Sequence, residues 1–350
     1  MSLARRPRLL CLLCQTRAFH PSYRILAEQR SSATPSPSAA TEKAATAITT
    51  ANPTPNIQSA KPTDPKAPQS PTVAPTLSPL EDAPRSYGKR VEKFTPKPLT
   101  RPIGMRNPPQ PGENTGIDLR TLKERRDDFA NYEKHLKRRQ ELTSKFSRPY
   151  FRDWGNLKFH KGKTFYPPPR PFKKDLSLFF PNLYGRTLLK SHVAPRDTTP
   201  TLLNKVSLVS VFSSVWAENQ TRTFTSAESS PDLDALLRQH PDVLQRVWIN
   251  VEENTLKAWL IRLFVGGIRR RIGEPNWGRY FVVRKGISDD IRESIGLLNS
   301  SVGYTYLLDG ECRIRWAGSG LCEEHEREGL VKAAQRLVEE QRNIVKREVS

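Results

Sequence analysis

The second half of the chain alternates short apolar runs with longer amphipathic segments, a pattern that predicts strands separated by helices. Three runs rich in β-branched and apolar residues have the length and composition of buried strands. They lie at residues 206–212, 243–251 and 280–283. A hairpin is predicted from strands at 304–308 and 312–316, because Asp309-Gly310 between them is a strong signal for a two-residue turn.

Amphipathic segments between and after these strands predict helices. The expected helices cover residues 231–239, 254–272, 289–298 and 323–341. Ser230 or Asp232 begins the first of them, and Asn254 caps the second. The order strand, helix, strand, helix, strand, helix, hairpin and helix is that of an α/β thioredoxin-like domain, in which helices flank a central mixed sheet. We expect this domain to span residues 176–345.

Two earlier segments carry many basic side chains. Asp118 is expected to cap a helix that ends near Ser144, within a charged helical region at 117–147. Residues 148–175 then mix aromatic residues such as Trp154 with many basic ones. This extended segment is either an RNA-binding surface or a segment that lies over the following domain. We favour the second interpretation, because base-stacking platforms normally belong to an ordered fold such as a sheet.

Composition divides the chain near its midpoint. Residues 1–175 hold 24 of the 30 prolines and 33 Lys+Arg against 15 Asp+Glu, a balance of +18. Residues 176–350 hold 24 Lys+Arg against 21 Asp+Glu, a balance of +3, so most of the net charge of +21 is N-terminal. Residues 31–116 are dominated by Pro, Ser, Thr, Ala and Lys, which offer too little apolar surface to offset the entropy of ordering. We therefore expect a disordered linker there.

The first 27 residues have the composition of a mitochondrial transit peptide. They contain five arginines and no Asp or Glu, with leucines between the basic positions. A secretory signal would need a longer apolar stretch, whereas Gln15, Thr16 and Arg17 end the apolar run here. We expect residues 1–30 to direct import into mitochondria. No run of 18 or more apolar residues occurs in the sequence, so no membrane-spanning helix is predicted.

Two strings of residues in the second half are distinctive. The expected strand at 206–212 continues as Ser213-Ser214-Val215-Trp216-Ala217-Glu218-Asn219-Gln220, and an upstream string runs Leu178-Phe179-Phe180-Pro181-Asn182-Leu183. Both resemble the signature of the fungal mitochondrial ATPase complex assembly factors. The resemblance covers about residues 176–345. It implies a family motif of seven residues: Phe180, Pro181, Ser213, Ser214, Trp216, Glu218 and Gln220.

The resemblance implies a non-enzymatic chaperone that is peripheral to the inner mitochondrial membrane on its matrix side. Such a protein binds newly made subunit a of the ATP synthase membrane sector and helps it join the ring of c subunits. The residues alone support only an imported α/β domain with exposed basic surfaces. The rival hypothesis is a mitochondrial RNA-associated or ribosome-associated basic protein, whose binding would fall steeply with salt. The leading hypothesis expects no nucleic acid.

No residue pattern supports redox catalysis. A thioredoxin-like oxidoreductase needs a Cys-x-x-Cys after its first strand, at about residues 213–219, because a low-pKa thiolate must attack the disulfide. This chain has no cysteine in that stretch. Its Cys-x-x-Cys pair, Cys11 and Cys14, lies in the expected transit peptide. A redox motif there would be removed on import.

The other candidate chemical groups have structural interpretations. Cys322 and His325 lack the further ligands of a four-coordinate structural zinc site. Trp216 and Glu218 are interpreted as packing and capping residues, since tryptophan is usually buried. We therefore expect no catalytic residue, no cofactor and no metal.

The helix expected at 254–272 is the most informative physical feature. Its apolar residues are predicted to form one stripe: Leu256, Trp259, Leu260, Leu263, Phe264, Ile268 and Ile272. Its C-terminal end is basic, which complements the helix dipole. One interpretation is an ordinary helix packed on the sheet. The other is contact with a membrane-protein client or anionic lipid through Trp259, Phe264, Arg269, Arg270 and Arg271. Both hold if the stripe packs inward and the arginines face out.

Overall fold

The computed structural model describes residues 80–86, 90–118, 120–133, 136, 139, 151–191, 194–253 and 255–349. The expected transit peptide and the first part of the expected linker, residues 1–79, lie outside the described residues. Within the described ranges, no helix is both long enough and apolar enough to cross a membrane.

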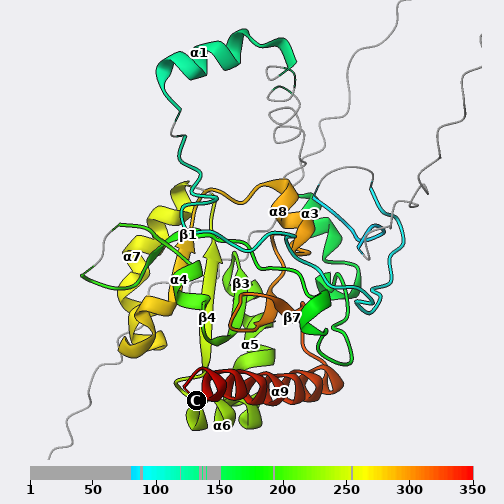
Figure 1. The fold of residues 1–350 in the computed structure, drawn as a ribbon. Coiled ribbons are helices and arrows are strands. Elements are labelled where there is room, and N and C mark those ends of the chain that lie inside the picture. The colour runs from blue at the N-terminus through cyan, green and yellow to red at the C-terminus, as the bar shows by residue number, and fades with distance from the viewer. Residues whose placement is uncertain are drawn as a thin grey trace, which may run out of the picture. The chain divides into compact units, whose positions relative to one another are not determined.

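In the described residues, the centre of the domain is a seven-stranded mixed sheet with strand order β2-β1-β5-β4-β3-β6-β7 (Figure 1). The strands are β1 (Tyr184–Thr187), β2 (Arg196–Asp197), β3 (Val206–Phe212), β4 (Leu244–Val251), β5 (Tyr280–Val283), β6 (Tyr304–Leu308) and β7 (Ile314–Ser319). The middle strands β5, β4 and β3 are parallel, and the other neighbours pair antiparallel. The register places Val209 of β3 beside Val247 of β4 and Tyr306 of β6.

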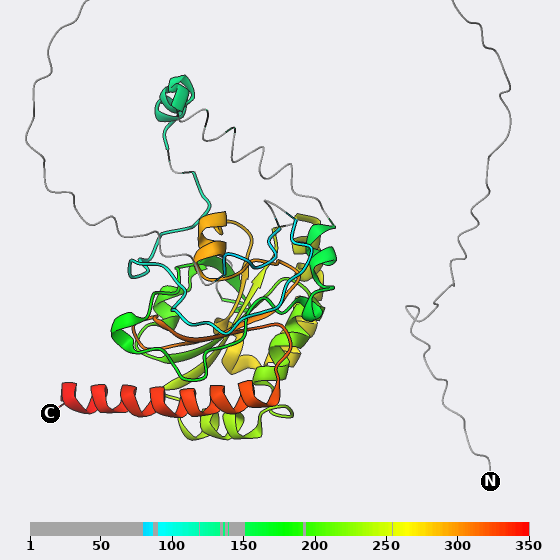
Figure 2. The ribbon, with the colours of Figure 1, turned by 90° about the vertical axis from the view of Figure 1, so that its right-hand side faces the viewer.

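Helices flank this sheet (Figures 1 and 2). They are α3 (Arg152–Asn156), α4 (Thr199–Leu202), α5 (Val215–Thr225), α6 (Pro231–Gln239), α7 (Thr255–Ile272), α8 (Asp289–Ser294) and α9 (Glu324–Val349). A further helix, α1 (Leu122–Ala130), is exposed at every position whose side chain is described. On the sheet face that carries Val206 and Leu208, buried apolar residues of α5, α6 and α9 form one cluster. The helix α7 packs on the same face, against Phe212 and Tyr280.

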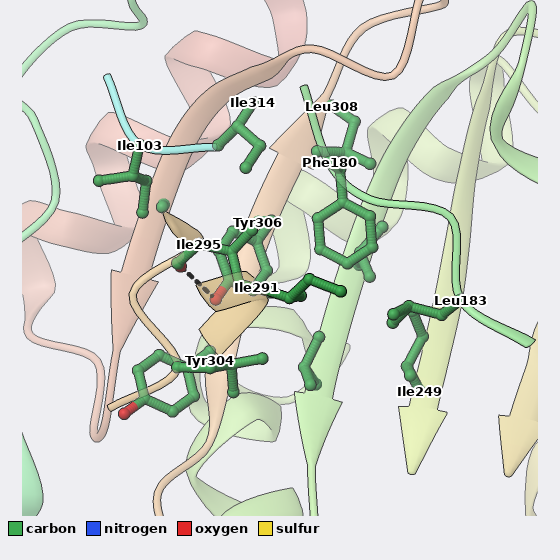
Figure 3. Close-up of a cluster of buried hydrophobic side chains, with 14 of the residues drawn as sticks. Ile103, Phe180, Leu183, Ile249, Ile291, Ile295, Tyr304, Tyr306, Leu308 and Ile314 are labelled. Carbon is green, nitrogen blue, oxygen red and sulfur yellow. Dashed lines mark hydrogen bonds between the residues drawn. The ribbon is translucent and has the colours of Figure 1, made fainter. Parts of the chain in front are cut away.

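The opposite face of the sheet is covered by α8 and by extended segments from the N-terminal half. Val209 and Val211 point to this side, because successive strand residues alternate between faces. The hydroxyl of Tyr306 donates to the carbonyl of Ile295 at 2.8 Å (Figure 3). The rings of Phe180 and Tyr306 meet edge to face with centroids 5.4 Å apart.

The predicted fold class, a mixed sheet with flanking helices in thioredoxin-like order, is confirmed by this topology. The strands at 206–212, 280–283 and 304–308 and the helix at 231–239 have the predicted bounds. Other elements differ at their ends. The helix α8 ends at Ser294 instead of 298, and α9 runs on to Val349 instead of 341.

The helix α5 was not among the predicted elements. Its outer positions include Val215 and Trp216, whereas Gln220 and Thr221 are buried with Phe224 on its inner side. Because the inner face mixes polar side chains with Phe224 and the outer face carries Val215 and Trp216, the usual apolar period is missing. Its clearest signal is Ser214, an N-cap residue whose hydroxyl accepts a hydrogen bond from the Ala217 amide at 3.2 Å.

The predicted two-residue hairpin turn is wrong. The connection between β6 and β7 runs from Asp309 to Arg313, and the second strand begins at Ile314. The Asp309 carboxylate accepts hydrogen bonds from the amides of Glu311 and Arg313, at 3.1 and 2.9 Å. Cys312 takes a left-handed φ of 63°. The side-chain bonds of Asp309 therefore set a longer turn.

The described part of the expected linker differs from the prediction. Residues 80–86 and 90–116 include the buried side chains of Leu80, Leu99 and Ile103, which join the core beneath α8. The amide of Leu99 donates to the carbonyl of Tyr166 at 3.0 Å. A few widely spaced apolar residues are therefore enough to hold a proline-rich stretch on the domain, although average composition indicates disorder.

The helix expected from Asp118 begins later. Thr121 caps α1, in a capping box with Glu124 whose two bonds measure 3.3 and 2.7 Å. Asp118 instead forms ion pairs with Arg120 and Arg125. The helix α1 ends at Ala130, and residues 140–147 of the expected helical region lie outside the described residues.

Two buried basic residues fasten the N-terminal half and β7 to α9. The Lys163 ammonium lies 2.7 Å from a Glu326 carboxylate oxygen, and both side chains are buried. Arg315 lies 2.9 Å from the Glu340 carboxylate and donates to the carbonyl of Phe172 at 2.7 Å. Residues 163–172 thus lie over the domain, which fits the second interpretation of the aromatic and basic segment.

Candidate functional site

The N-terminal end of α5 follows β3 directly and is the first part of the candidate site. In a thioredoxin-like order, this is where a redox protein would carry its cysteines. Val215 is 70% exposed and Trp216 is 42% exposed, so both present apolar surface to solvent. The prediction that Trp216 is a buried packing residue is therefore wrong. Glu218 does not cap the helix either, because Ser214 does.

Two neighbouring loops are fastened to this end of α5. The Gln220 side chain accepts from the Gly303 amide at 2.9 Å and donates to the Lys161 carbonyl at 3.3 Å. Ser213 donates from its hydroxyl to the carbonyl of Ser300. A Cβ on Gly303 would lie 2.2 Å from the carbonyl oxygen of Ala217, so only glycine fits this approach. The surface around α5 is therefore fixed in position.

Asp153 at the start of α3 ties the same loop to the N-terminal segment. Its carboxylate accepts from the hydroxyls of Ser86 and Ser300 and from the amide of Ser300. The Asn299 side chain donates to the Asp153 carbonyl at 3.0 Å. Asp153 was not predicted as a functional residue. Nothing in its local sequence marks it, since its partners lie far away along the chain.

The two cysteines in the described part of the chain are free, and neither lies in the stretch 213–219. Cys312 is buried in the hairpin turn, and Cys322 is half-buried just before α9. Burial raises the pKa of each thiol to about 12. Thiolates are the reactive form of cysteine, so both side chains are poor nucleophiles at neutral pH.

A cavity of about 270 Å³ lies beyond the carboxyl ends of β3 and β4. Its lining includes Ser213, Ser300, Glu252, Glu253 and Arg292. The Arg292 guanidinium donates to the Glu253 carboxylate at 2.6 Å, so these two charges compensate one another. Ligands of open α/β sheets commonly bind at this edge. Among the described residues, no group of three or more His, Cys, Asp or Glu side chains could hold a metal ion.

An ion pair joins α5 to α7. Arg271, at the end of α7, lies 2.7 Å from the Glu218 carboxylate, which is 10% exposed. Beneath the two helices, Asn250 donates to the hydroxyl of Tyr280 at 3.3 Å. Burial raises the pKa of Tyr280 to about 12, so its phenol stays protonated. Among the motif residues, Glu218 thus positions α7 relative to α5.

The apolar residues of α7 do not form the single inward stripe that the sequence predicted. Val265, Ile268 and Ile272 pack against the core of the domain. Trp259, Leu263 and Phe264 are instead exposed by 57%, 58% and 66%, respectively. The side chains of Leu256 and Leu260 lie outside the described residues. Apolar residues thus occupy two sides of this helix, one packed and one in solvent.

The three arginines at the end of α7 have different environments. Arg269 is half-buried, where it donates to the carbonyl of Leu188 at 2.7 Å and lies 5.5 Å from the centre of the Trp277 ring. The expectation that it faces outward is therefore wrong. Arg270 is exposed, as expected, and Arg271 is exposed but paired with Glu218. Of the three, Arg270 has the most open surroundings.

The upstream motif residues belong to the core. Phe180 and Pro181 are buried on the sheet face opposite α5. Their neighbour Asn182 is fully buried and donates to the Asp197 carboxylate at 2.7 Å, while its side-chain oxygen accepts from the hydroxyl of Thr199 at 2.8 Å. The motif therefore divides into a structural part and a part at α5. Asn182 lies in the upstream string but was not predicted as a site residue. Its side chain joins three segments.

Solved structures that align with part of the chain include bacterial thiol-disulfide proteins. A DsbF homologue from Corynebacterium diphtheriae aligns with a TM-score of 0.32 and 13% identity, covering 48% of this chain and 91% of that one. A secreted thiol-disulfide isomerase from Corynebacterium glutamicum aligns with a TM-score of 0.34 and 12% identity, covering 51% and 99%.

Sequence comparisons extend over most of the chain. The protein is 30% identical over 235 residues to the mitochondrial ATPase complex subunit ATP10 of Eremothecium gossypii, covering 67% of this chain and 82% of that protein. It is 27% identical to the protein of the same description from Saccharomyces cerevisiae, covering 70% and 88%. The ATP10 protein family model matches residues 85–337. These matches agree with the resemblance in the motif, and the chain belongs to the ATP10 protein family.

Proposed function

We propose that this protein is an assembly factor for the membrane sector of mitochondrial ATP synthase and acts by binding alone. Membership of the ATP10 family, whose relatives are described as mitochondrial ATPase complex subunits, supports a role in assembling that complex. The observation that supports a binding role is the exposed apolar surface at the N-terminal end of α5. Exposed Val215 and Trp216 lie where an oxidoreductase would carry a disulfide pair, on a rigidly held surface.

The client in this proposal is newly made subunit a, which the protein holds at the matrix face of the inner membrane until the ring of c subunits arrives. Membrane proteins have apolar surfaces that need protection before assembly, and exposed aromatic side chains can cover such surfaces. The structure offers two sets of these side chains, one on α5 and one on α7. No cofactor or metal takes part in this mechanism.

The first test is removal of the gene, followed by pulse labelling of mitochondrial translation products and native gel electrophoresis. We expect subunit a to be synthesised normally but degraded, while the c ring still forms. Normal assembly of the membrane sector in the deletion strain would contradict the proposal. A chain carrying Cys312→Ala and Cys322→Ser should restore assembly, because binding needs no thiol. Failure of this folded variant would indicate thiol chemistry instead.

The second test asks whether Trp216 contacts the client. A photo-crosslinking amino acid at position 216 should capture subunit a in intact mitochondria. The same amino acid at position 154 is the control, because Trp154 is also exposed, by 62%, but lies in α3. Capture of ribosomal RNA that disappears at high salt would favour the rival hypothesis of an RNA-associated protein.

A further inference from the structure

The outer face of α7 carries an unusual set of exposed side chains. Trp259 and Leu263 are four residues apart, and Arg270 follows Leu263 after seven, so the three share one side of the helix. Phe264 follows Leu263 in sequence, about 100° further round the helix, and is 66% exposed. Large apolar residues are usually exposed singly rather than in groups, and grouped ones mark interaction surfaces.

This exposure does not arise from a loosely attached helix. Val265, Ile268 and Ile272 pack the C-terminal half of α7 against the core, and the Glu218–Arg271 ion pair holds its end. Gly266 and Gly267 add no side chains, and a Cβ on either would meet nothing within 4 Å. The outer face is therefore open, and no described part of the chain covers it.

Charge indicates what covers this face. The helix α7 contains five basic residues and no acidic residue among its 18 positions. At its C-terminal end, Arg269 and Lys190 each lie 5.5 Å from the centre of the same Trp277 ring, with Arg270 exposed nearby in sequence. A purely apolar client helix would not match this charge. A surface with negatively charged groups above an apolar interior matches it.

We infer that the outer face of α7 docks on an anionic phospholipid surface. Trp259, Leu263 and Phe264 enter the boundary between head groups and acyl chains, while Arg270 contacts the lipid phosphates. The inference rests on the proposed function only in placing the protein at the inner membrane. It leaves the end of α5, with Trp216, free to meet the client while α7 holds the domain on the lipid.

A local fluorescent probe tests this docking in the full-length chain. Leu263→Cys carries an environment-sensitive nitrobenzoxadiazole dye, in a background where Cys11, Cys14 and Cys322 are Ser. Leu176→Cys carries the control dye, because Leu176 is similarly exposed, by 64%, but lies outside α7. The probes are vesicles of phosphatidylcholine with or without phosphatidylglycerol. Because the signal is local, vesicle binding by the arginine-rich N-terminus does not imitate it.

We expect the dye at position 263 to brighten with phosphatidylglycerol vesicles and to be quenched by lipids brominated in their acyl chains, with little change at position 176. Arg270→Glu should weaken the response about 25-fold, since each charge near the surface changes partitioning about fivefold and reversal counts twice. Lys332→Glu is the matched charge control, because the Lys332 side chain is exposed on α9. Trp259→Ser with Phe264→Ser should weaken the response roughly tenfold or more.

Three results would overturn the inference. They are an unchanged dye at position 263, an equal response at both positions, and a response that ignores phosphatidylglycerol. Capture of subunit a by a crosslinker at position 263 in mitochondria would show that the client, rather than lipid, covers α7. None of these results affects the gene-deletion test of the assembly function. The lipid-docking inference and the proposed function can therefore each be contradicted without the other.

Discussion

The helices α7 and α9 are both long and amphipathic, yet they use their apolar residues differently. In α9, the side chains of Leu330, Leu337 and Val338 are buried against the sheet, and the exposed large apolar residues Ile344 and Val345 lie only in its last two turns. In α7, Val265, Ile268 and Ile272 pack inward, whereas Trp259, Leu263 and Phe264 are exposed to solvent. The charges differ as well, since α9 has six basic and six acidic residues whereas α7 has five basic and no acidic residue.

This difference separates two roles that a helical pattern alone does not distinguish. The outer face of α9 carries ion pairs one turn apart, Lys332 with Glu328 and Arg336 with Glu340, as expected for a helix that faces only water. The outer face of α7 has unbalanced charge and exposed aromatic rings. We interpret α9 before Ile344 as a helix segment whose apolar contacts are complete within the domain and α7 as one whose contacts are completed by another surface.

The largest expected effect is the loss of unfolding free energy when the buried ion pair that holds α9 to the N-terminal half is broken. Lys163→Ala removes the partner of Glu326, whose side chain is fully buried, and leaves that carboxylate in the interior without a counter-charge. Breaking a buried ion pair in this way costs about 3–5 kcal/mol of unfolding free energy. Urea unfolding of the full-length protein, followed by circular dichroism, measures the loss.

Lys332→Ala is the matched control, because its ion pair with Glu328 is exposed on the same helix. Exposed pairs contribute about 0–1 kcal/mol, so this variant should unfold at nearly the same urea concentration as the original chain. Equal losses for the two lysines would show that α9 is not fastened through Lys163.

The second prediction compares the same substitution in both helices. Leu330→Ala in α9 should lower the unfolding free energy by about 2–5 kcal/mol, since the side chain is fully buried. Leu263→Ala in α7 should change it by no more than about 0.5 kcal/mol, because this side chain already lies mostly in solvent. Urea unfolding measures both. A large loss at Leu263 would show that its face is covered within the domain.

The sequence predicts the central strands well, but it does not predict which side of α7 packs against the core. The strand β3 is buried on both faces, so its run of apolar residues is nearly continuous and easy to recognise. The bounds of α7 also follow from its pattern. Trp259 and Ile268, however, lie on opposite sides of one helix that is apolar on both, and periodicity does not reveal which side the core takes.

The parts of the candidate site that escaped prediction depend on contacts between distant segments. Gln220 was named through the family resemblance alone, and nothing in its spacing indicates that it bridges Lys161 and Gly303 across three segments. The Asp153 carboxylate likewise accepts hydrogen bonds from Ser86 and Ser300, which lie in two other segments. Such networks form only after the chain has folded, so neither residue spacing nor composition predicts them.

The smallest expected effect concerns the two glycines in the middle of α7. Gly267→Ala should raise the unfolding free energy by about 0.5–1 kcal/mol, because alanine loses less backbone entropy in a helix and meets no neighbour here. Gly303→Ala is the opposite case, since its Cβ would collide with the carbonyl oxygen of Ala217 and should destabilise the protein. Thermal unfolding measures both changes. If Gly267→Ala were destabilising, the outer face of α7 would be in contact with the rest of the chain, and the contrast with α9 would disappear.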